Sequence, residues 1–145
     1  MKTRTLVIIC ISLVIAAVIL MSGSCENGVT PSMEGTWVNS AYNASQDFYG
    51  KVELINNGDG TYTEKVYDND FDTVPADTII VTVTEETMDS EGNLFVKWEA
   101  DYGVLTYILG KVHANNTTFE ANWSETTYPT VIDSGDPNYN IYYRQ

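Results

Sequence analysis

The stretch FYGKVELINNGDGTYTEKVY, residues 48–67, carries the clearest structural signal in this chain. Its centre, NNGDG at residues 56–60, is rich in Asn and Gly, which tolerate positive φ and turn one strand back on the next. The flanking segments Phe48–Ile55 and Thr61–Tyr67 are enriched in β-branched and aromatic residues. We therefore expect an antiparallel hairpin here, with residues 56–60 as its turn.

The rest of the chain after residue 34 shows the same kind of pattern. No window there sustains the apolar period of a helix, whereas several segments alternate or are rich in β-branched and aromatic residues. The further strands expected are Thr36–Tyr42, Thr78–Thr84, Leu94–Glu99, Tyr102–Val112, Thr117–Ser124 and Asn140–Arg144. Eight strands with mostly short connections predict an all-β fold, an eight-stranded up-and-down antiparallel β-barrel, because closure removes exposed sheet edges. A two-sheet β-sandwich is the alternative.

The size and charge of the chain limit what it can be. Its 145 residues, 16.1 kDa, suit one domain. It carries 20 acidic and 7 basic residues, a net charge of −13. Such a surface repels phosphate backbones, which proteins bind through clustered Lys and Arg. No nucleic-acid partner is therefore expected.

The first 25 residues have the layout of an export signal. Lys2 and Arg4 precede the apolar run Leu6–Met21, which is short for a bilayer span, and small residues at 22–24 lead directly to Cys25. This layout resembles the lipobox of bacterial lipoproteins, in which the Cys is lipidated and the preceding peptide bond is cut. The resemblance implies lipidation at Cys25 and a membrane partner through that N-terminal lipid. The alternatives are an ordinary signal peptide that leaves Cys25 a free thiol, or an uncleaved anchor.

The lipoprotein interpretation divides the chain into three parts. Residues 1–24 are expected to be the signal peptide, residues 25–33 a tether and residues 34–145 the barrel domain. The mature part would carry five basic residues against all 20 acidic ones, a net side-chain charge of −15. The expected location is the bacterial cell envelope, at the outer membrane or cell surface, because Glu26 is not the Asp associated with inner-membrane retention.

The triplet Gly35-Thr36-Trp37 stands at the start of the expected barrel domain. It resembles the Gly-x-Trp element on the first strand of lipocalins and the wider calycin superfamily, and the closest likeness is to compact lipocalin-like bacterial lipoproteins. The resemblance implies that Trp37 plugs one end of the barrel and that Arg144 on the last strand packs across its ring, a favourable cation–π arrangement. It also implies that a small apolar ligand binds inside.

The sequence leaves open whether the barrel is hollow. Large side chains on short strands can occupy a narrow interior completely. The side chains that would fill it are Trp98, Trp123, Phe119, Tyr107 and Leu105. If the barrel holds a cavity, we expect that cavity to open away from the Trp37 end.

The chain offers little for catalysis. Its only histidine, His113, is expected to be a surface or loop residue, since catalytic zinc sites use several His or Cys. The sequence contains no Gly-x-Ser-x-Gly elbow and no phosphate-binding glycine loop, so we expect a non-enzymatic protein without a cofactor. Asp68, Asp70 and Asp72 alternate in a loop and form a weak calcium candidate, although Thr73 stands where an EF-hand needs glycine.

Two functions are compatible with these features. The first is a membrane-anchored, non-enzymatic envelope lipoprotein whose lipocalin-like barrel binds a small apolar ligand or displays a surface. The second is an acidic interaction module that captures a cationic partner protein, because a mature charge of −15 steers such encounters.

Overall fold

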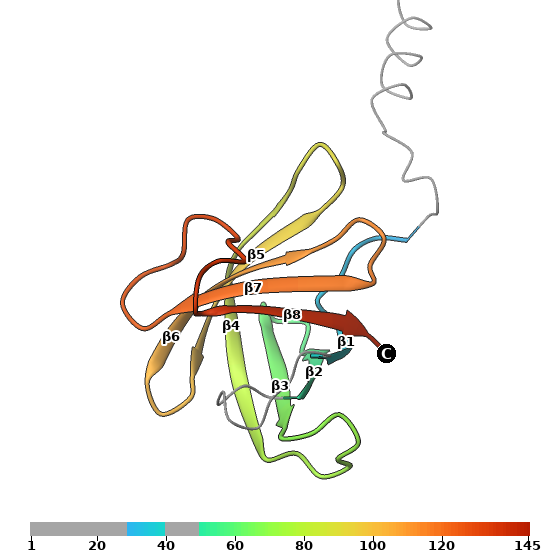
Figure 1. Ribbon diagram of the computed structural model, residues 1–145, viewed down its shortest axis with the longest axis vertical. Helices are drawn as coiled ribbons and strands as arrows, with labels where there is room; N and C mark the ends of the chain where they lie inside the picture. The colour runs from blue at the N-terminus through green and yellow to red at the C-terminus, as the bar shows by residue number, and fades with distance from the viewer. Residues whose placement is uncertain (1–28, 40–49) are drawn as a thin grey trace, which may run out of the picture.

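The computed structural model describes residues 29–39 and 50–145, which form an eight-stranded antiparallel β-barrel (Figure 1). The strands are β1 (Gly35–Val38), β2 (Lys51–Asn56), β3 (Thr61–Tyr67), β4 (Asp77–Met88), β5 (Leu94–Asp101), β6 (Leu105–Val112), β7 (Thr118–Ser124) and β8 (Tyr139–Arg144). Each strand pairs with the next, and β1 pairs with β8. The predicted all-β, up-and-down barrel is confirmed, and the sandwich alternative is wrong.

The pairing of β1 with β8 closes the barrel. Trp37 lies opposite Arg144, and Val38 lies opposite Tyr143. In an up-and-down barrel with an even number of strands the chain enters and leaves at the same end, and Figure 1 shows the blue segment before β1 on the same side as the C-terminus. We call this end, marked by Trp37 and Arg144, the closed end. The opposite end, which carries the connections at residues 68–76, 102–104 and 125–138, is the mouth.

The turn of the β2–β3 hairpin forms as its sequence predicts. Strand β3 has the predicted bounds, Thr61–Tyr67. Gly58 and Gly60 have φ values of 80° and 87°, in the region that glycine adopts without strain. The Asp59 carboxylate accepts hydrogen bonds from both the backbone N–H and the hydroxyl of Thr61. The turn is thus specified by hydrogen bonds between Asp59 and Thr61, next to the glycines from which it was predicted.

Strand β4 is longer than predicted, spanning Asp77–Met88 rather than Thr78–Thr84. Its pairing with β5 shifts register between Val83 and Glu85. A bulge of this kind interrupts the alternation of inward and outward side chains, so a boundary drawn from alternation falls at the bulge. The strand continues beyond it, and its exposed end forms the β4–β5 hairpin at the top of Figure 1.

Strand β6 begins later than predicted, at Leu105 rather than Tyr102. Residues 102–104 form the tight connection from β5 instead. The backbone N–H of Tyr102 donates to the carbonyl oxygen of Val104, and Gly103 has a φ of 92°. Glycine allows this turn in the middle of an apolar run. Tyr102 and Val104 consequently lie at the mouth and not in the barrel wall.

Strand β1 ends at Val38 rather than Tyr42, and β2 begins at Lys51 rather than Phe48. The remaining strand ends agree with the predictions to within about two residues, which is the usual uncertainty of such boundaries. The predicted strands Thr36–Tyr42 and Phe48–Ile55 both run into residues 40–49, which lie outside the described residues. Met33, placed by the sequence at the end of the tether, is 1% exposed and packs in the hydrophobic core.

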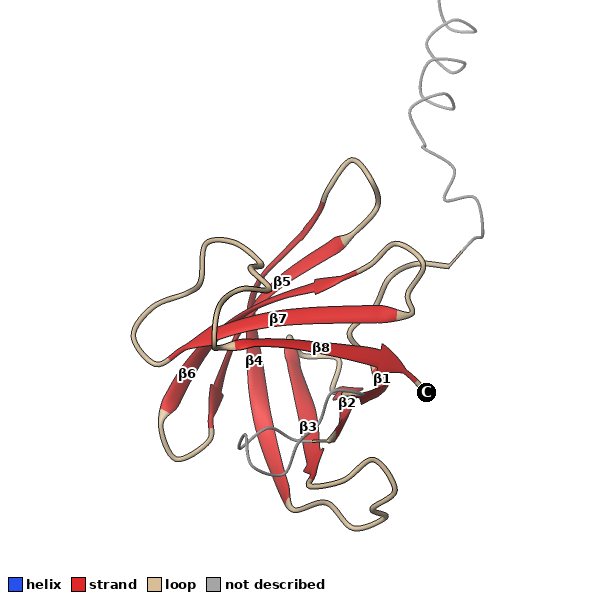
Figure 2. Ribbon diagram, viewed as in Figure 1, coloured by secondary structure: helices blue, strands red, loops and turns tan. Residues whose placement is uncertain are grey.

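The barrel interior holds the alternate side chains of every strand. Its fully buried members include Trp37 on β1, Val66 on β3, Val81 on β4, Val96 on β5 and Val112 on β6. Among the described residues there is no helix (Figure 2), and hence none with the length and apolar character needed to cross a membrane.

Candidate functional site

The closed end is built around the indole of Trp37. This side chain is fully buried, and its Nε1 donates a hydrogen bond to the carbonyl oxygen of Met33 at 2.7 Å. The guanidinium carbon of Arg144 lies 4.2 Å from the centre of the indole ring. The structure therefore brings together the two side chains that the lipocalin resemblance singles out.

Arg144 also joins three parts of the chain at this end. Its guanidinium donates hydrogen bonds of 2.8 Å to the carbonyl oxygens of Ser32 and Glu34, before β1. It donates two more, also of 2.8 Å, to the carbonyl and Oδ1 oxygens of Asn116 between β6 and β7. A planar guanidinium held by four acceptors cannot be replaced by the single ammonium of lysine.

Gly35 makes room for this arginine. Its φ is 136°, where residues with a side chain are strained, and a Cβ at this position would overlap Nη1 of Arg144. Gly35, Trp37 and Arg144 thus form one structural unit, in which the glycine permits the stacking of the other two.

A layer of aromatic rings lies above Trp37 and forms what we call the aromatic floor: Trp98, Phe119 and Tyr142. The ring of Phe119 is centred 5.5 Å from Trp37, 5.7 Å from Trp98 and 5.9 Å from Tyr142. Gly110 faces this layer, where a Cβ would overlap the Trp98 ring and lie 2.7 Å from Cε2 of Phe119. The missing side chain at Gly110 therefore allows the rings to pack.

A cavity of about 410 Å³ extends from the aromatic floor to the mouth. Residues from β2, β3, β5, β6, β7 and β8 line it, and Trp37 does not. At its outer end lie Tyr102, Val104 and Glu125, which belong to the mouth connections. The cavity lies on the side of the aromatic floor away from Trp37, as expected for a hollow barrel.

The five large side chains proposed to fill the barrel do not all point inward. Leu105 is 45% exposed, and Tyr107 packs edge-on against Tyr128, its ring centre 5.2 Å away, outside the cavity lining. Trp98, Phe119 and Trp123 face the interior but line the cavity rather than close it. The filled-barrel alternative is therefore wrong, because β6 directs Leu105 and Tyr107 to the outer surface.

Glu64 is the polar group that distinguishes this cavity. It points inward from β3, is buried, and accepts a hydrogen bond of 2.6 Å from the hydroxyl of Tyr102. Burial raises the pKa of Glu64 to about 7, and the hydrogen bond from Tyr102 opposes this shift only in part. A carboxyl group with such a pKa is poised between its neutral and charged forms at neutral pH.

The remaining polar lining consists of hydrogen-bonding groups and one further acid. Thr106 and Asn140 line the wall, and Glu125 lies near the mouth. The indole Nε1 of Trp98 is buried and has no hydrogen-bond partner within the described part of the chain. The described residues of the lining include no Lys, Arg or His. The arrangement can hold an apolar molecule and offers it acidic and hydrogen-bonding contacts, but it contains no nucleophile with an adjacent base.

The sequence analysis missed Glu64 and Tyr102. A signal for Glu64 was present, because it occupies an inward position of the correctly predicted strand Thr61–Tyr67, between Tyr62 and Val66. A charged residue at an inward position of an alternating strand is unusual enough to mark a candidate site. Tyr102 gave no such signal, since its place depends on the turn at Gly103.

The structure does not gather Asp68, Asp70 and Asp72 into a calcium site. Across residues 29–39 and 50–145 no three His, Cys, Asp or Glu side chains are arranged to hold a metal ion. The Asp72 carboxylate accepts hydrogen bonds from Asn69, and the ammonium of Lys51 donates to the Asp72 carbonyl oxygen at 2.5 Å. A lysine at this place repels a cation, so the calcium candidate is not supported.

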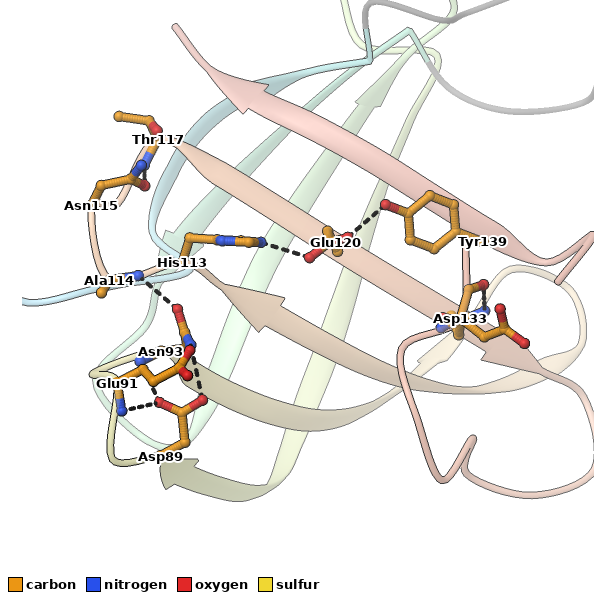
Figure 3. A network of polar contacts seen from close by, with 11 residues as sticks. Asp89, Glu91, Asn93, His113, Ala114, Asn115, Thr117, Glu120, Asp133 and Tyr139 are labelled. Carbon is orange, nitrogen blue, oxygen red and sulfur yellow. Dashed lines mark hydrogen bonds and ion pairs between the residues drawn. The ribbon is translucent and has the colours of Figure 1, made fainter. Parts of the chain in front are cut away.

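His113 belongs to a polar network on the outer face of the barrel. Figure 3 shows Glu120 of β7 between His113 and Tyr139, at 2.6 Å from Nε2 of the histidine and 2.7 Å from the tyrosine hydroxyl. Burial raises the pKa of Glu120, but the hydrogen bonds from Tyr139 and His113 outweigh it, so its pKa lies below the usual value. The network links β6, β7 and β8 and lies outside the cavity.

Comparisons of the chain with protein-family models, with curated proteins and with solved structures found no match. The lipidation candidate Cys25 and the expected signal peptide, residues 1–24, lie outside the described residues. Functional inference therefore rests on the barrel, its closed end and its cavity.

Proposed function

We propose that this protein is a lipid-anchored protein of the cell envelope that binds a small apolar molecule inside its barrel and catalyses no reaction. The observation that carries the proposal is the cavity of about 410 Å³, with its largely apolar and aromatic lining. Small-molecule pockets usually measure about 300 to 1,000 Å³ and combine apolar walls with a few polar groups.

The position of the cavity supports the membrane-anchored form of this proposal. The chain enters the barrel at the closed end, and the mouth lies at the opposite end. A lipid on Cys25 would attach to that entering segment, so the mouth would face away from the membrane. A ligand could then enter from the aqueous phase without passing the anchor.

Binding of a neutral apolar probe tests the proposal. We expect 1-naphthylmethanol to bind the full-length protein at one site, measured by isothermal titration calorimetry. Ala121 lines the cavity and is 6% exposed, so Ala121→Phe should fill the space and abolish binding. Ala76 is exposed on the β3–β4 connection, and Ala76→Phe is the matched control. Equal binding by the two folded variants would contradict a site inside the barrel.

One observation favours the second candidate function, capture of a cationic partner protein. Phe71 and Val74, each 77% exposed, stand among acidic residues on the β3–β4 connection at the mouth. Exposed apolar side chains ringed by charge are typical of contact surfaces. This function predicts partner binding that weakens with added salt and is lost in Phe71→Ser, whereas cavity binding is unaffected by that substitution.

A further inference from the structure

The cavity is acidic as well as apolar. Among the described residues that line it, two carry carboxyl groups, Glu64 in the wall and Glu125 near the mouth, and none is basic. A fatty acid or other organic anion bound there would meet carboxyl groups and no cation. A wholly neutral hydrocarbon would leave the buried carboxyl of Glu64 without a function. The charge of the lining therefore restricts the class of ligand.

Within residues 29–39 and 50–145, no charged side chain pairs with Glu64 inside the barrel. Its side chain is buried, and its carboxylate accepts a hydrogen bond of 2.6 Å from the neutral hydroxyl of Tyr102. Burial raises the pKa of Glu64, and the hydrogen bond from Tyr102 lowers it in part. No Lys or Arg contributes to the shift. Buried carboxylates in proteins are normally paired with a cation, because an unpaired charge in a low-dielectric interior is costly. A ligand can supply the missing positive charge.

The aromatic rings that line the cavity with Glu64 suit the same kind of ligand. Trp98, Phe119, Trp123 and Tyr142 all line the cavity, and aromatic faces attract ammonium groups. The buried Nε1 of Trp98, without a partner in the described chain, adds a donor for an oxygen on the ligand. The cavity thus combines the carboxyl group of Glu64, several aromatic faces and the indole N–H donor of Trp98.

We propose that the cavity selects organic amines, with an apolar body against the aromatic floor and a protonated amino group paired with Glu64. This inference rests on the proposed function, since it names the chemistry of the ligand that the barrel binds. Glu64 acts as a binding and specificity-determining residue, and the hydroxyl of Tyr102 positions its carboxyl group.

The pairing links binding to proton release. In the part of the chain that the structure describes, the other titratable groups that line the cavity are Tyr102, Tyr142 and Glu125, and none of them supplies a positive charge. Because burial raises the pKa of Glu64 to about 7, part of the free protein carries a proton there at neutral pH. An ammonium ligand favours the ionised form, so its binding expels that proton. Amine affinity should therefore rise as pH increases through 7, as long as the amine itself stays protonated.

Three probes with one apolar body test the inference: 1-naphthylmethylamine, 1-naphthylmethanol and 1-naphthoate, measured by calorimetry on the full-length protein at pH 7. We expect the amine to bind at least about tenfold tighter than the alcohol, since a hydrogen bond between an ammonium and a carboxylate is stronger than one from a neutral hydroxyl. We also expect 1-naphthoate to bind weakest. Titration in buffers with different heats of ionisation should show proton release for the amine alone.

Glu64→Gln should remove the preference for the amine while alcohol binding persists, because glutamine keeps the shape and the acceptor for Tyr102. Glu53→Gln is the matched control, since Glu53 lies on the outer face, paired with Lys65 at 3.0 Å. Equal affinity for amine and alcohol, preference for 1-naphthoate, or an amine preference that survives Glu64→Gln would overturn the inference and leave the proposed function standing. Failure of all three probes to bind the wild-type protein would refute both.

Discussion

Single residues determine the character of both ends of the barrel. At the closed end, Arg144 stacks on Trp37 and satisfies four oxygen acceptors, so one side chain on β8 holds the segment before β1 and the β6–β7 connection. In the cavity, Glu64 is buried beside a single neutral hydroxyl. The first residue stabilises the fold, whereas the second has a cost in stability that the proposed role in binding would explain.

Burial of the ionised Glu64 carboxylate lowers the free energy of unfolding, and this gives a prediction for how stability depends on pH. Its pKa is about 7 in the folded protein against an ordinary value of 4.5, so the unfolded chain loses its proton first as pH rises. The Glu64 contribution to the free energy of unfolding therefore falls between pH 4.5 and 7, by about 3 kcal/mol. We expect Glu64→Gln to raise the melting temperature at pH 7.5 and to change it little at pH 4.

Denaturant unfolding of Glu64→Gln and of the outer-face control Glu53→Gln at both pH values checks this prediction. A Glu64→Gln variant that is less stable than the wild type at pH 7.5 would show that the carboxylate is already well paired inside the barrel. That result would also remove the reason to expect a cationic ligand.

At the scale of the strands, local signals predicted the elements, and tertiary contacts decided where several of them end. The NNGDG turn forms as expected because Asp59, Gly58 and Gly60 specify it locally. The end of β4 was missed because a bulge between Val83 and Glu85 breaks the alternation. The start of β6 was missed because the turn at Gly103 interrupts an apolar run.

The candidate site could be predicted only in part for a related reason. The unit formed by Gly35, Trp37 and Arg144 can be predicted from the sequence. The Gly-x-Trp triplet stands on the first strand of the domain, and the resemblance to lipocalins expects a basic residue on the last strand, where Arg144 lies. The cavity depends on which face each side chain takes, as Leu105 and Tyr107 illustrate. A one-residue shift in the register of β6 would exchange its two faces, and both faces carry apolar residues, so the local sequence does not determine the assignment.

The junction of β1 and β8 gives a prediction about closure. Gly35→Ala places a Cβ against the Arg144 guanidinium at a strained φ of 136°. Gly58→Ala is the matched control, because Gly58 also has positive φ but has open space around it. We expect Gly58→Ala to cost about 1 kcal/mol of unfolding free energy from backbone strain alone, and Gly35→Ala clearly more. Equal losses in denaturant unfolding would mean that the contact with Arg144 does not constrain Gly35.

At the scale of the molecule, the barrel has a distinct orientation: a closed end next to the entering chain, and a mouth at the far end (Figure 1). If Cys25 carries a lipid, the mouth lies at the end of the barrel opposite the segment that carries the anchor. The large negative charge of the chain would add solubility and would attract cationic ligands to that mouth.

The lipid anchor gives a prediction of its own. We expect the wild-type protein to fractionate with membranes and its N-terminal peptide to carry acyl chains on Cys25, detected by mass spectrometry. Cys25→Ser should lose both properties, because acyl chains supply the membrane affinity. Membrane association and an intact, unmodified N-terminus in both proteins would instead support the uncleaved-anchor alternative.

The central claim, that the barrel is a binding site for a small molecule, can be tested with the indole N–H resonances of Trp37, Trp98 and Trp123. Trp98 and Trp123 line the cavity, whereas Trp37 lies beneath the aromatic floor with its N–H bonded to Met33. Titration of the ¹⁵N-labelled protein with 1-naphthylmethylamine should shift the Trp98 and Trp123 signals strongly and the Trp37 signal little. If all three signals stay unchanged at saturating probe, or if Trp37 alone responds, the barrel does not bind its ligand as we describe.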